Sequence, residues 1–163
     1  MELIERDSFL AAMQSQFEHV SNGEGRCVFI SGEAGIGKTS LIKTFCNEVK
    51  NKCNIYQGIC DALFTPRPLA PLYDVLLQLG KTIPQGNIDT TNRTAFFTNF
   101  LHELNDPDKV NLLVFEDIHW ADEATLDFIK FLARRVTQLK CLFILTYRDT
   151  EIHSGHPLRN IMG

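Results

Sequence analysis

The sequence lacks the segments that direct a protein to a membrane or out of the cell. None of its apolar runs reaches the roughly 20 residues that a membrane-spanning helix requires. Residues 1–7 contain no basic stretch followed by an apolar one, so they do not form a secretory signal. We therefore expect a cytoplasmic protein that makes no contact with a membrane.

The chain also lacks the cysteine pattern of a disulfide framework or a structural zinc site. Its five cysteines are odd in number and form no C-x-x-C pair. Cys27 and Cys141 stand inside apolar runs, where cysteine behaves as a small buried hydrophobic residue. We expect a structural role for all five, which are Cys27, Cys46, Cys53, Cys60 and Cys141.

Clustered basic residues are scarce as well. The formal net charge is −4, and Arg134 and Arg135 form the only basic pair that is adjacent in the sequence. A nucleic-acid backbone requires a basic face, so we expect no direct nucleic-acid contact by this segment. The two arginines lie near the end of a predicted helix, where cations complement the helix dipole.

What the chain does contain is enough apolar sequence for one core. With 163 residues, of which 44% are hydrophobic, it is long enough for one globular domain over residues 1–163 and too short for two. Four short runs have β-strand character, and the first, third and fourth are almost continuously apolar, as in strands buried on both faces of a parallel sheet. The four runs cover residues 27–31, 54–59, 111–115 and 141–147.

Apolar residues between these runs recur at the three- and four-residue intervals of amphipathic helices. The four stripes are Leu10, Met13, Phe17 and Val20; Leu72, Val75, Leu76 and Leu79; Phe96, Phe97, Phe100, Leu101 and Leu104; and Leu126, Ile129, Leu132 and Val136. The phenylalanines have the spacing of a core-facing helix rather than of a base-stacking platform, and Asp122 is placed to cap the last helix. Strands that alternate with helices predict a three-layer α/β/α fold with a mainly parallel sheet.

Two segments lie outside this alternation. Residues 81–92 have the weakest pattern, and we expect an exposed loop there. Residues 156–163 read as the start of another element, so we expect this core to be the N-terminal part of a longer nucleotide-binding domain.

A glycine-rich segment follows the first run and opens the next helix. It reads Gly32, Glu33, Ala34, Gly35, Ile36, Gly37, Lys38 and Thr39, which is the P-loop pattern G-x-x-x-x-G-K-T. Glycines let the backbone wrap a phosphate with its N–H groups pointing inward, and the helix start adds further N–H donors. Lys38 supplies a mobile positive charge for the β- and γ-phosphates, and the Thr39 hydroxyl can hold Mg²⁺.

The alternative is a glycine-rich turn that binds nothing. A strand before the loop and a helix after it are the context that confirms the motif, and they argue against this alternative. We predict that these residues, together with Ser40, bind ATP or ADP.

Two carboxylates end the third run. Glu116 and Asp117 follow it directly, at the end of the sheet where open α/β proteins bind ligands. Mg²⁺ requires an acidic anchor there, and hydrolysis requires a group that orients the attacking water. Neighbouring residues on a strand point to opposite sides, so we expect the two acids to have different roles. The usual order is Asp and then Glu; because it is reversed here, either acid could hold the metal, and we expect slow hydrolysis. A pair of solvated acids without function is the alternative.

Two further residues are candidates on position alone. His119 lies two positions past the acids and could contact them, or it could serve only in packing. Arg148, at the end of the fourth run, could point toward the γ-phosphate and report its presence. Pairing with a neighbouring acid explains Arg148 equally well.

Together these motifs resemble those of the STAND class of signal-transduction ATPases, which are AAA-like P-loop proteins. The resemblance is carried by residues 32–39, 116–122 and 146–149, and it covers essentially the whole chain. Residues 60–69 and 124–128 are most similar to the modules of large LuxR-type transcription activators and of ATPases linked to bacterial adenylate cyclases. The resemblance implies a nucleotide switch whose ATP and ADP forms differ in shape, self-associate differently and control a covalently attached output domain.

The resemblance also implies roles for single residues. Arg6 would border the adenine pocket, although Glu5 stands where the family usually has glycine, and Arg148 would be the sensor arginine. The fifth core strand, the helical lid and the winged-helix region of relatives have no counterpart in the chain.

The predicted function is therefore an ATP-binding switch with slow Mg²⁺-dependent hydrolysis, acting in transcriptional regulation. The alternative is a non-catalytic scaffold whose nucleotide is structural. A GTPase is disfavoured because the guanine-reading Asn-Lys-x-Asp element is missing, and a small-molecule kinase because no arginine-rich lid is present.

Overall fold

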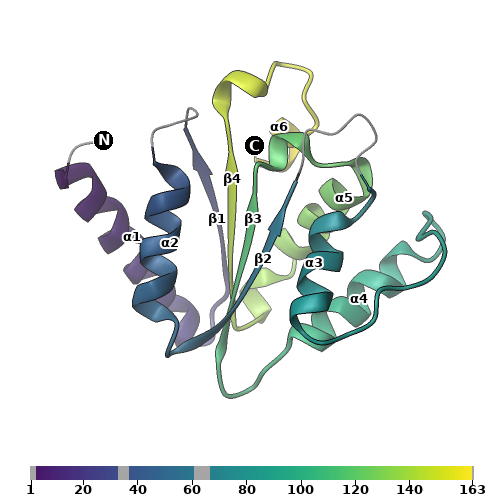
Figure 1. Ribbon diagram of the computed structural model, residues 1–163, viewed down its shortest axis with the longest axis horizontal. Helices are drawn as coiled ribbons and strands as arrows, with labels where there is room; N and C mark the ends of the chain where they lie inside the picture. Colours follow the sequence, from purple (N-terminus) through teal and green to yellow (C-terminus); the bar gives the residue numbers. More distant parts are fainter. Residues whose placement is uncertain (1–2, 33–36, 61–66, 163) are drawn as a thin grey trace.

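The computed structural model of the protein describes residues 3–32, 37–60 and 67–162, and a parallel sheet lies at its centre (Figure 1). The strands in these ranges are β1 (Arg26–Ser31), β2 (Cys53–Ile59), β3 (Val110–Glu116) and β4 (Cys141–Tyr147). They are ordered β1-β4-β3-β2, and every neighbouring pair is parallel. The predicted strands and the predicted parallel sheet are confirmed.

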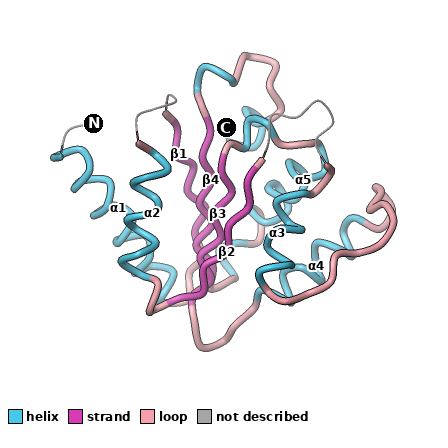
Figure 2. Tube along the Cα trace, in the orientation of Figure 1, coloured by secondary structure: helices cyan, strands magenta, loops and turns pink. Residues whose placement is uncertain are grey.

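Helices cover both faces of the sheet and make three layers (Figures 1 and 2). One face carries α1 (Leu3–Ser21) and α2 (Lys38–Val49). The other carries α3 (Ala70–Gln78), α4 (Arg93–Leu104) and α5 (Glu123–Ala133). The shorter elements are the 3₁₀ turns η1 (Ile118–Trp120), η2 (Val136–Gln138) and η3 (Asp149–Glu151) and the last helix, α6 (Leu158–Met162).

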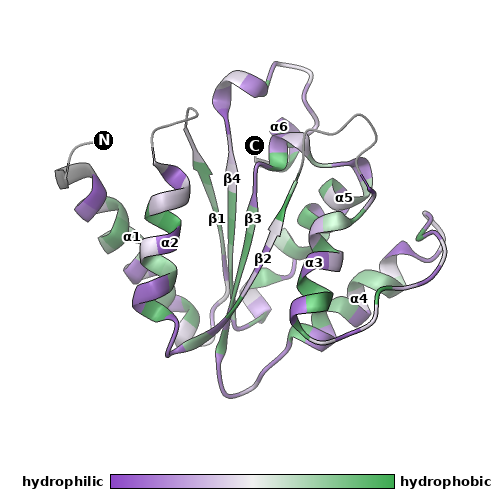
Figure 3. Cartoon of the chain, in the orientation of Figure 1, coloured by the Kyte–Doolittle hydropathy of each residue, from purple (hydrophilic) through white to green (hydrophobic). Residues whose placement is uncertain are grey.

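The alternation of side chains along a strand sorts the apolar residues of β3 and β4 between two cores. Leu112 and Val114 of β3 belong to the core under α1 and α2. Leu113 and Phe115 belong to the core under α3, α4 and α5. All four are 0% exposed, and the strands are largely coloured as hydrophobic in Figure 3. A strand buried on both sides has to be apolar at every position, which explains the continuous run.

β1 is less buried than its apolar run predicts. Its residues from Arg26 to Ile30 are only half-buried, whereas β3 and β4 are buried up to their last residue. The sheet order explains the difference, because β1 pairs with β4 on one side and lies at the edge of the sheet within the described residues.

The phenylalanine stripe of α4 faces the core, as predicted. Phe97 and Phe100 are buried, and their rings lie 5.2 Å and 5.1 Å from that of Phe128 in α5. Edge-to-face packing of this kind adds to the free energy gained by burial. The stripe is therefore not available as a base-stacking surface.

Three further expectations can be compared with the structure. Residues 81–92 contain no helix or strand. All five cysteines are free thiols, and burial raises the pKa of both Cys27 and Cys141 to about 12. In the described part of the chain, no helix combines the length and the apolar character needed to cross a bilayer.

Candidate functional site

The predicted site residues come together at the carboxyl ends of the strands. Because the sheet is parallel, the ends of β1, β3 and β4 lie at the same edge, next to the start of α2 (Figures 1 and 2). Gly32 is hydrogen-bonded directly to the end of β4, where its N–H donates to the Tyr147 carbonyl at 3.2 Å. The phosphate-loop sequence therefore starts beside the segment that carries Arg148.

α2 begins without a side-chain cap. The residue before it, Gly37, has φ 87° and ψ 19°, a left-handed conformation that glycine adopts without the strain of a Cβ atom. No side chain hydrogen-bonds to this helix start among the described residues. The first N–H groups of a helix have no partner within the helix, so an uncapped start suits an anion. The predicted loop residues Glu33, Ala34, Gly35 and Ile36 lie outside the described residues.

Lys38 reaches from the start of α2 to the ends of two strands. Its Nζ donates to the carbonyl oxygens of Gly32 at 3.0 Å and of Tyr147 at 3.4 Å. Both acceptors are neutral backbone groups, which bind an ammonium less strongly than phosphate oxygens do. The Lys38 charge is thus held at the strand edge by partners that an anionic ligand can replace.

The first turns of α2 also carry the other predicted nucleotide contacts. Thr39 and Ser40 are exposed. One turn later, the Thr44 hydroxyl accepts a hydrogen bond of 2.8 Å from Nη2 of Arg6 in α1. The structure therefore brings Arg6 to the same helix as Thr39 and Ser40, on the turn that follows them.

Strand alternation predicts that both acids lie on β3 and point to opposite faces, but only Glu116 belongs to the strand. Glu116 is the last residue of β3 and is half-buried. Asp117 has already left the strand and has the left-handed φ of 59°, and its N–H donates to the Thr146 hydroxyl at 3.0 Å. Asp tolerates this conformation better than most residues do, and such strained positions concentrate at functional sites. The different positions of the two acids therefore follow from this turn rather than from strand alternation.

Glu116 lies on the α2 side of the sheet. Burial raises the pKa of Cys46 in α2 to about 11, and the negative charge of Glu116 adds to the rise. Glu116 is also separated from Leu112 and Val114, which pack under α2, by an even number of residues along β3. Side chains spaced in this way lie on the same face of a sheet. It is accordingly the acid on the side where the P-loop helix starts.

His119 connects the turn at Glu116 and Asp117 (the acidic turn) to the end of β4. It is 6% exposed, and its Nδ1 accepts a hydrogen bond of 3.3 Å from the N–H of Arg148. Burial lowers the pKa of His119, as does the positive charge of Arg148, whereas the charge of Asp117 opposes this. A neutral imidazole that accepts at Nδ1 carries its proton on Nε2. That atom is buried and has no hydrogen-bond partner among the described residues.

Sequence reasoning missed two contacts of this turn. Thr146, 2% exposed, supplies the hydroxyl that holds Asp117, and a hydroxyl at the end of an apolar strand is a signal that could have been used. His156 is half-buried, with its Nε2 3.1 Å from the carbonyl oxygen of His119. Nothing in the local sequence marks His156, because the two histidines belong to different elements.

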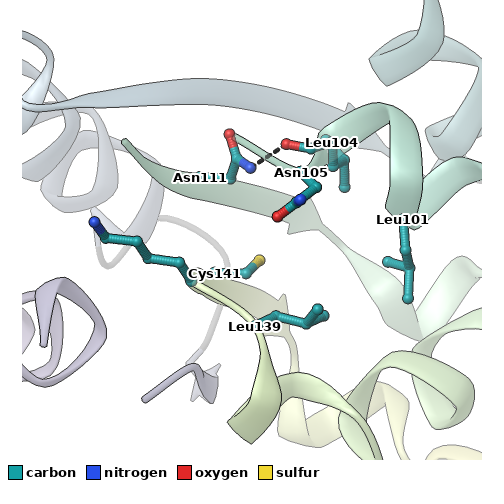
Figure 4. A pocket seen from close by; sticks show the side chains of 7 residues that line it. Leu101, Leu104, Asn105, Asn111, Leu139 and Cys141 are labelled. Carbon is teal, nitrogen blue, oxygen red and sulfur yellow. Dashed lines mark hydrogen bonds between the residues drawn. The ribbon is translucent and has the colours of Figure 1, made fainter. Parts of the chain in front are cut away.

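One pocket lies away from this edge. Figure 4 shows a pocket whose lining includes Asn111 and Cys141, at the amino ends of β3 and β4; its volume is about 20 Å³. The side-chain amide of Asn111 donates to the Leu104 carbonyl across it. Since open α/β sheets bind their ligands at the carboxyl ends of the strands, this pocket is not the predicted site.

The chemistry of the strand edge suits a hydrated Mg²⁺ ion better than a metal held by protein alone. Among the described residues, no group of three or more His, Cys, Asp or Glu side chains could hold a metal ion. Mg²⁺ usually keeps several waters and binds one or two carboxylates together with nucleotide phosphates. Thr39, Glu116 and Asp117 fit that smaller requirement.

The fold and this edge define a class of protein. A parallel α/β sheet whose first strand leads through a glycine-rich segment to an uncapped helix, with acids after the third strand, is the P-loop NTPase fold. Within that class, the chain belongs to the AAA_16 family, described as an AAA ATPase domain, whose model matches residues 2–145.

Solved structures share this fold at low sequence identity. Cdc6p from Pyrobaculum aerophilum matches 99% of this chain with a TM-score of 0.70 and 19% identity. Orc1 from Aeropyrum pernix, solved in complex with DNA, matches 88% with a TM-score of 0.64 and 13% identity. The RuvB Holliday junction branch migration motor of Thermotoga maritima matches 98% with a TM-score of 0.50 and 16% identity. At these identities the likeness is one of fold alone.

The chain spans less than half of each of these proteins: 44% of the Cdc6p chain, 39% of the Orc1 chain and 43% of the RuvB chain. Among curated protein sequences, no match was found. The predicted AAA-like P-loop ATPase module is thus confirmed, and the STAND and LuxR-type assignments stay predictions.

Proposed function

We propose that this chain is an ATP-binding switch module that hydrolyses ATP slowly with Mg²⁺ and regulates an attached output domain. The observation that carries the proposal is the uncapped start of α2 after Gly37, with the Lys38 ammonium resting on two backbone carbonyls. The family match to an AAA ATPase domain supports it.

Nucleotide binding would use groups that are already in position. Lys38 would exchange the carbonyls of Gly32 and Tyr147 for phosphate oxygens, while the N–H groups at the start of α2 would bind the same phosphates. Thr39 would hold Mg²⁺ with Glu116 or Asp117, and Mg²⁺ supplies neutralisation of the phosphate charge when bound. Arg6 would border the adenine, beside the same helix.

Hydrolysis would depend on the turn that contains Asp117. One of the two acids would orient the attacking water, and the other would hold the metal ion. His119 acts in this proposal as a positioning residue, because it accepts the N–H of Arg148 and lies directly after the acidic turn. Arg148 would then sense the γ-phosphate. The left-handed turn at Asp117 and the reversed order of the acids support slow rather than fast turnover.

Beyond η1, which follows the turn at Asp117, Asp122 links the starts of two helices. Asp122 accepts hydrogen bonds from the N–H of Thr125 in α5 and, at 3.2 Å, from the N–H of Leu69 at the start of α3. A rearrangement that moves Asp122 would therefore displace the start of α3 as well. Such a connection supports a switch over a scaffold, and the role in transcription rests on the resemblance of residues 60–69 and 124–128.

The partners proposed are the nucleotide, an output domain in the parent protein and further copies of the chain that associate according to the bound nucleotide. Orc1 was solved with DNA, and that finding belongs to Orc1. We propose no nucleic-acid contact for this segment, because its net charge is −4.

Replacement of Lys38 tests the proposal directly. In the complete protein, Lys38→Ala should weaken Mg²⁺–ATP binding by about 100-fold, because truncating one partner of a charge-assisted hydrogen bond costs about 2–5 kcal/mol. Calorimetric titration measures the affinity, and far-UV circular dichroism checks that the fold is intact. Lys43→Ala, which removes an exposed lysine from the same helix, is the matched control. Unchanged affinity in the Lys38 variant would contradict the proposal.

The acids separate the switch from the scaffold. Glu116→Gln and Asp117→Asn keep the size of each side chain and remove its charge. We expect at least one of them to lose most ATP turnover while still binding ATP. Absence of turnover in the complete wild-type protein would favour the scaffold.

A further inference from the structure

A basic groove lies between α4 and α5, on the face of the sheet opposite α2. It has a volume of about 380 Å³, and four basic side chains and one acidic side chain line it. The charged residues are Arg93, Asp127, Lys130, Arg134 and Arg135. In a chain whose formal net charge is −4, this is a local excess of positive charge.

Arg93 is part of the wall of the groove. Its side chain is 13% exposed and forms an ion pair with Asp127, and its Nη1 lies 3.7 Å from the Glu123 carboxylate. These acids neutralise Arg93. By contrast, Lys130, Arg134 and Arg135 are exposed and form no ion pair within the described parts of the chain. Three cations therefore face solvent along one side of the groove.

Arg135 is held in position before any ligand arrives. Its guanidinium lies 3.7 Å from the centroid of the Phe131 ring, and its Nη1 donates to the Phe131 carbonyl at 3.0 Å. A side chain ordered in this way loses less conformational entropy on binding. This arrangement favours recognition of an anionic group over simple solvation.

The groove continues into an apolar part. A second hollow of about 370 Å³ shares Phe131 and Arg135 with the basic groove and is also lined by Leu101 and Leu139. Both leucines line the pocket of Figure 4 too. From Thr94 to Asn105, the two hollows follow α4 for about 17 Å, at 1.5 Å per residue. A ligand that fills both must be acidic at one end and apolar at the other.

We propose that the α4–α5 groove docks an acidic amphipathic peptide segment of a partner protein. Carboxylates of the peptide pair with Lys130, Arg134 and Arg135, and its apolar side chains lie against Leu101 and Leu139. Arginine clusters and helix-lined grooves are established means of recognising such segments. A nucleic-acid backbone fits less well, because it offers no apolar side chains for the second hollow. The helix-dipole interpretation of Arg134 and Arg135 extends to Lys130 in the last turn of α5, but it does not account for Arg93, the first residue of α4.

The experiment uses the complete chain and a fluorescein-labelled 12-residue helical peptide with glutamates in one half and leucines in the other. Fluorescence anisotropy should show saturable binding that weakens at higher salt. Arg134→Ala/Arg135→Ala should weaken it about tenfold or more, as expected for the loss of two charge pairs. The matched control is Lys43→Ala/Lys50→Ala, which removes one exposed lysine from α2 and another directly after its end, and it leaves binding unchanged.

Three further measurements keep the proposal open to refutation. A peptide with glutamine in place of glutamate should bind about as weakly as the arginine double variant binds the original peptide. If the double variant does not fold, Lys130→Gln replaces it as the test, because it removes the charge of an exposed side chain and should also weaken peptide binding. Absence of saturable binding by the wild-type chain would overturn the proposal, and so would a duplex DNA that binds through these residues more tightly than the peptide. ATP binding should be the same in all variants, which separates this surface from the nucleotide site.

Discussion

The two faces of the sheet are packed by different side chains. Under α1 and α2 the buried rings are Phe17 and Phe45, with centroids 6.4 Å apart, and the other buried residues of that core are aliphatic residues, cysteines and Met13. Under α3, α4 and α5 the core contains a phenylalanine cluster centred on Phe128, with Phe97, Phe100, Phe115 and Phe143 around it. The second face is therefore held together by more aromatic contact.

The two faces also differ in how their helices are capped at the carboxyl edge of the sheet. On the first face, α2 starts after Gly37, and no side chain of the described residues caps it. On the second, α5 is capped by Asp122, which also holds the start of α3. The comparison indicates that the α3–α5 face contributes most of the rigidity, while the α2 face keeps a helix start available to a ligand. The predictions below test that division.

The largest effect is expected from Phe128→Ala. Phe128 is 0% exposed, and its truncation should lower the free energy of unfolding by about 3–5 kcal/mol. Phe45→Ala, equally buried on the other face, should cost less, because each aromatic pair adds about 0.5–1.5 kcal/mol and Phe45 has fewer of them. Urea unfolding of both variants measures the difference. An equal or larger loss for Phe45→Ala would show that the two faces do not differ in this way.

A smaller effect is expected from Asp122→Ala. The substitution removes the cap of α5 and the acceptor for the Leu69 N–H, so we expect a loss of about 1–2 kcal/mol in the free energy of unfolding. Thermal unfolding would detect it, and hydrogen exchange should be faster at the start of α3 as well as of α5. Faster exchange confined to α5 would mean that Asp122 does not couple the two helices.

The smallest effect is expected on the pH dependence of the free energy of unfolding, through Asp106 near the amino end of the sheet. Hydrogen bonds from the N–H of Asp108 and from Asn54 lower the pKa of Asp106 below its ordinary value of 3.8. A carboxylate with a lowered pKa stabilises the fold above the pKa of the unfolded chain, and this contribution is lost as the pH falls through the pKa of the folded chain. Asp106→Asn should therefore make stability less dependent on pH below about 4. Asp108→Asn, a neighbouring exposed acid, is the control, and an unchanged pH dependence in Asp106→Asn would refute the assignment.

The fold was largely predictable from local patterns. Continuous apolar runs marked β3 and β4 because strands buried on both faces need an apolar residue at every position. The cap at Asp122 was predictable because a cap depends on residues within one turn. The half-buried state of β1 was not, because exposure depends on which strands lie beside it, and the order β1-β4-β3-β2 is not written in the spacing of the runs.

The candidate site likewise has features that local sequence predicts and features that it does not. The phosphate loop and the acids were predicted from motifs whose backbone requirements are local, and their roles stay predictions. The left-handed turn at Asp117, the hydroxyl of Thr146 beneath it and the contact of His156 with His119 were not, because each joins or depends on segments distant in the sequence.

Residue order was enough to set the class of this protein, since glycines before a lysine at a helix start and acids after a buried strand have few other uses in an α/β fold. Packing alone decided that Lys38 rests on the end of β4 and that Arg93 meets Lys130 and Arg134 in one groove. The physical reason is range: hydrophobic periodicity and backbone conformation act over a few residues, whereas charges on separate helices become neighbours only when those helices bury their apolar faces against one sheet.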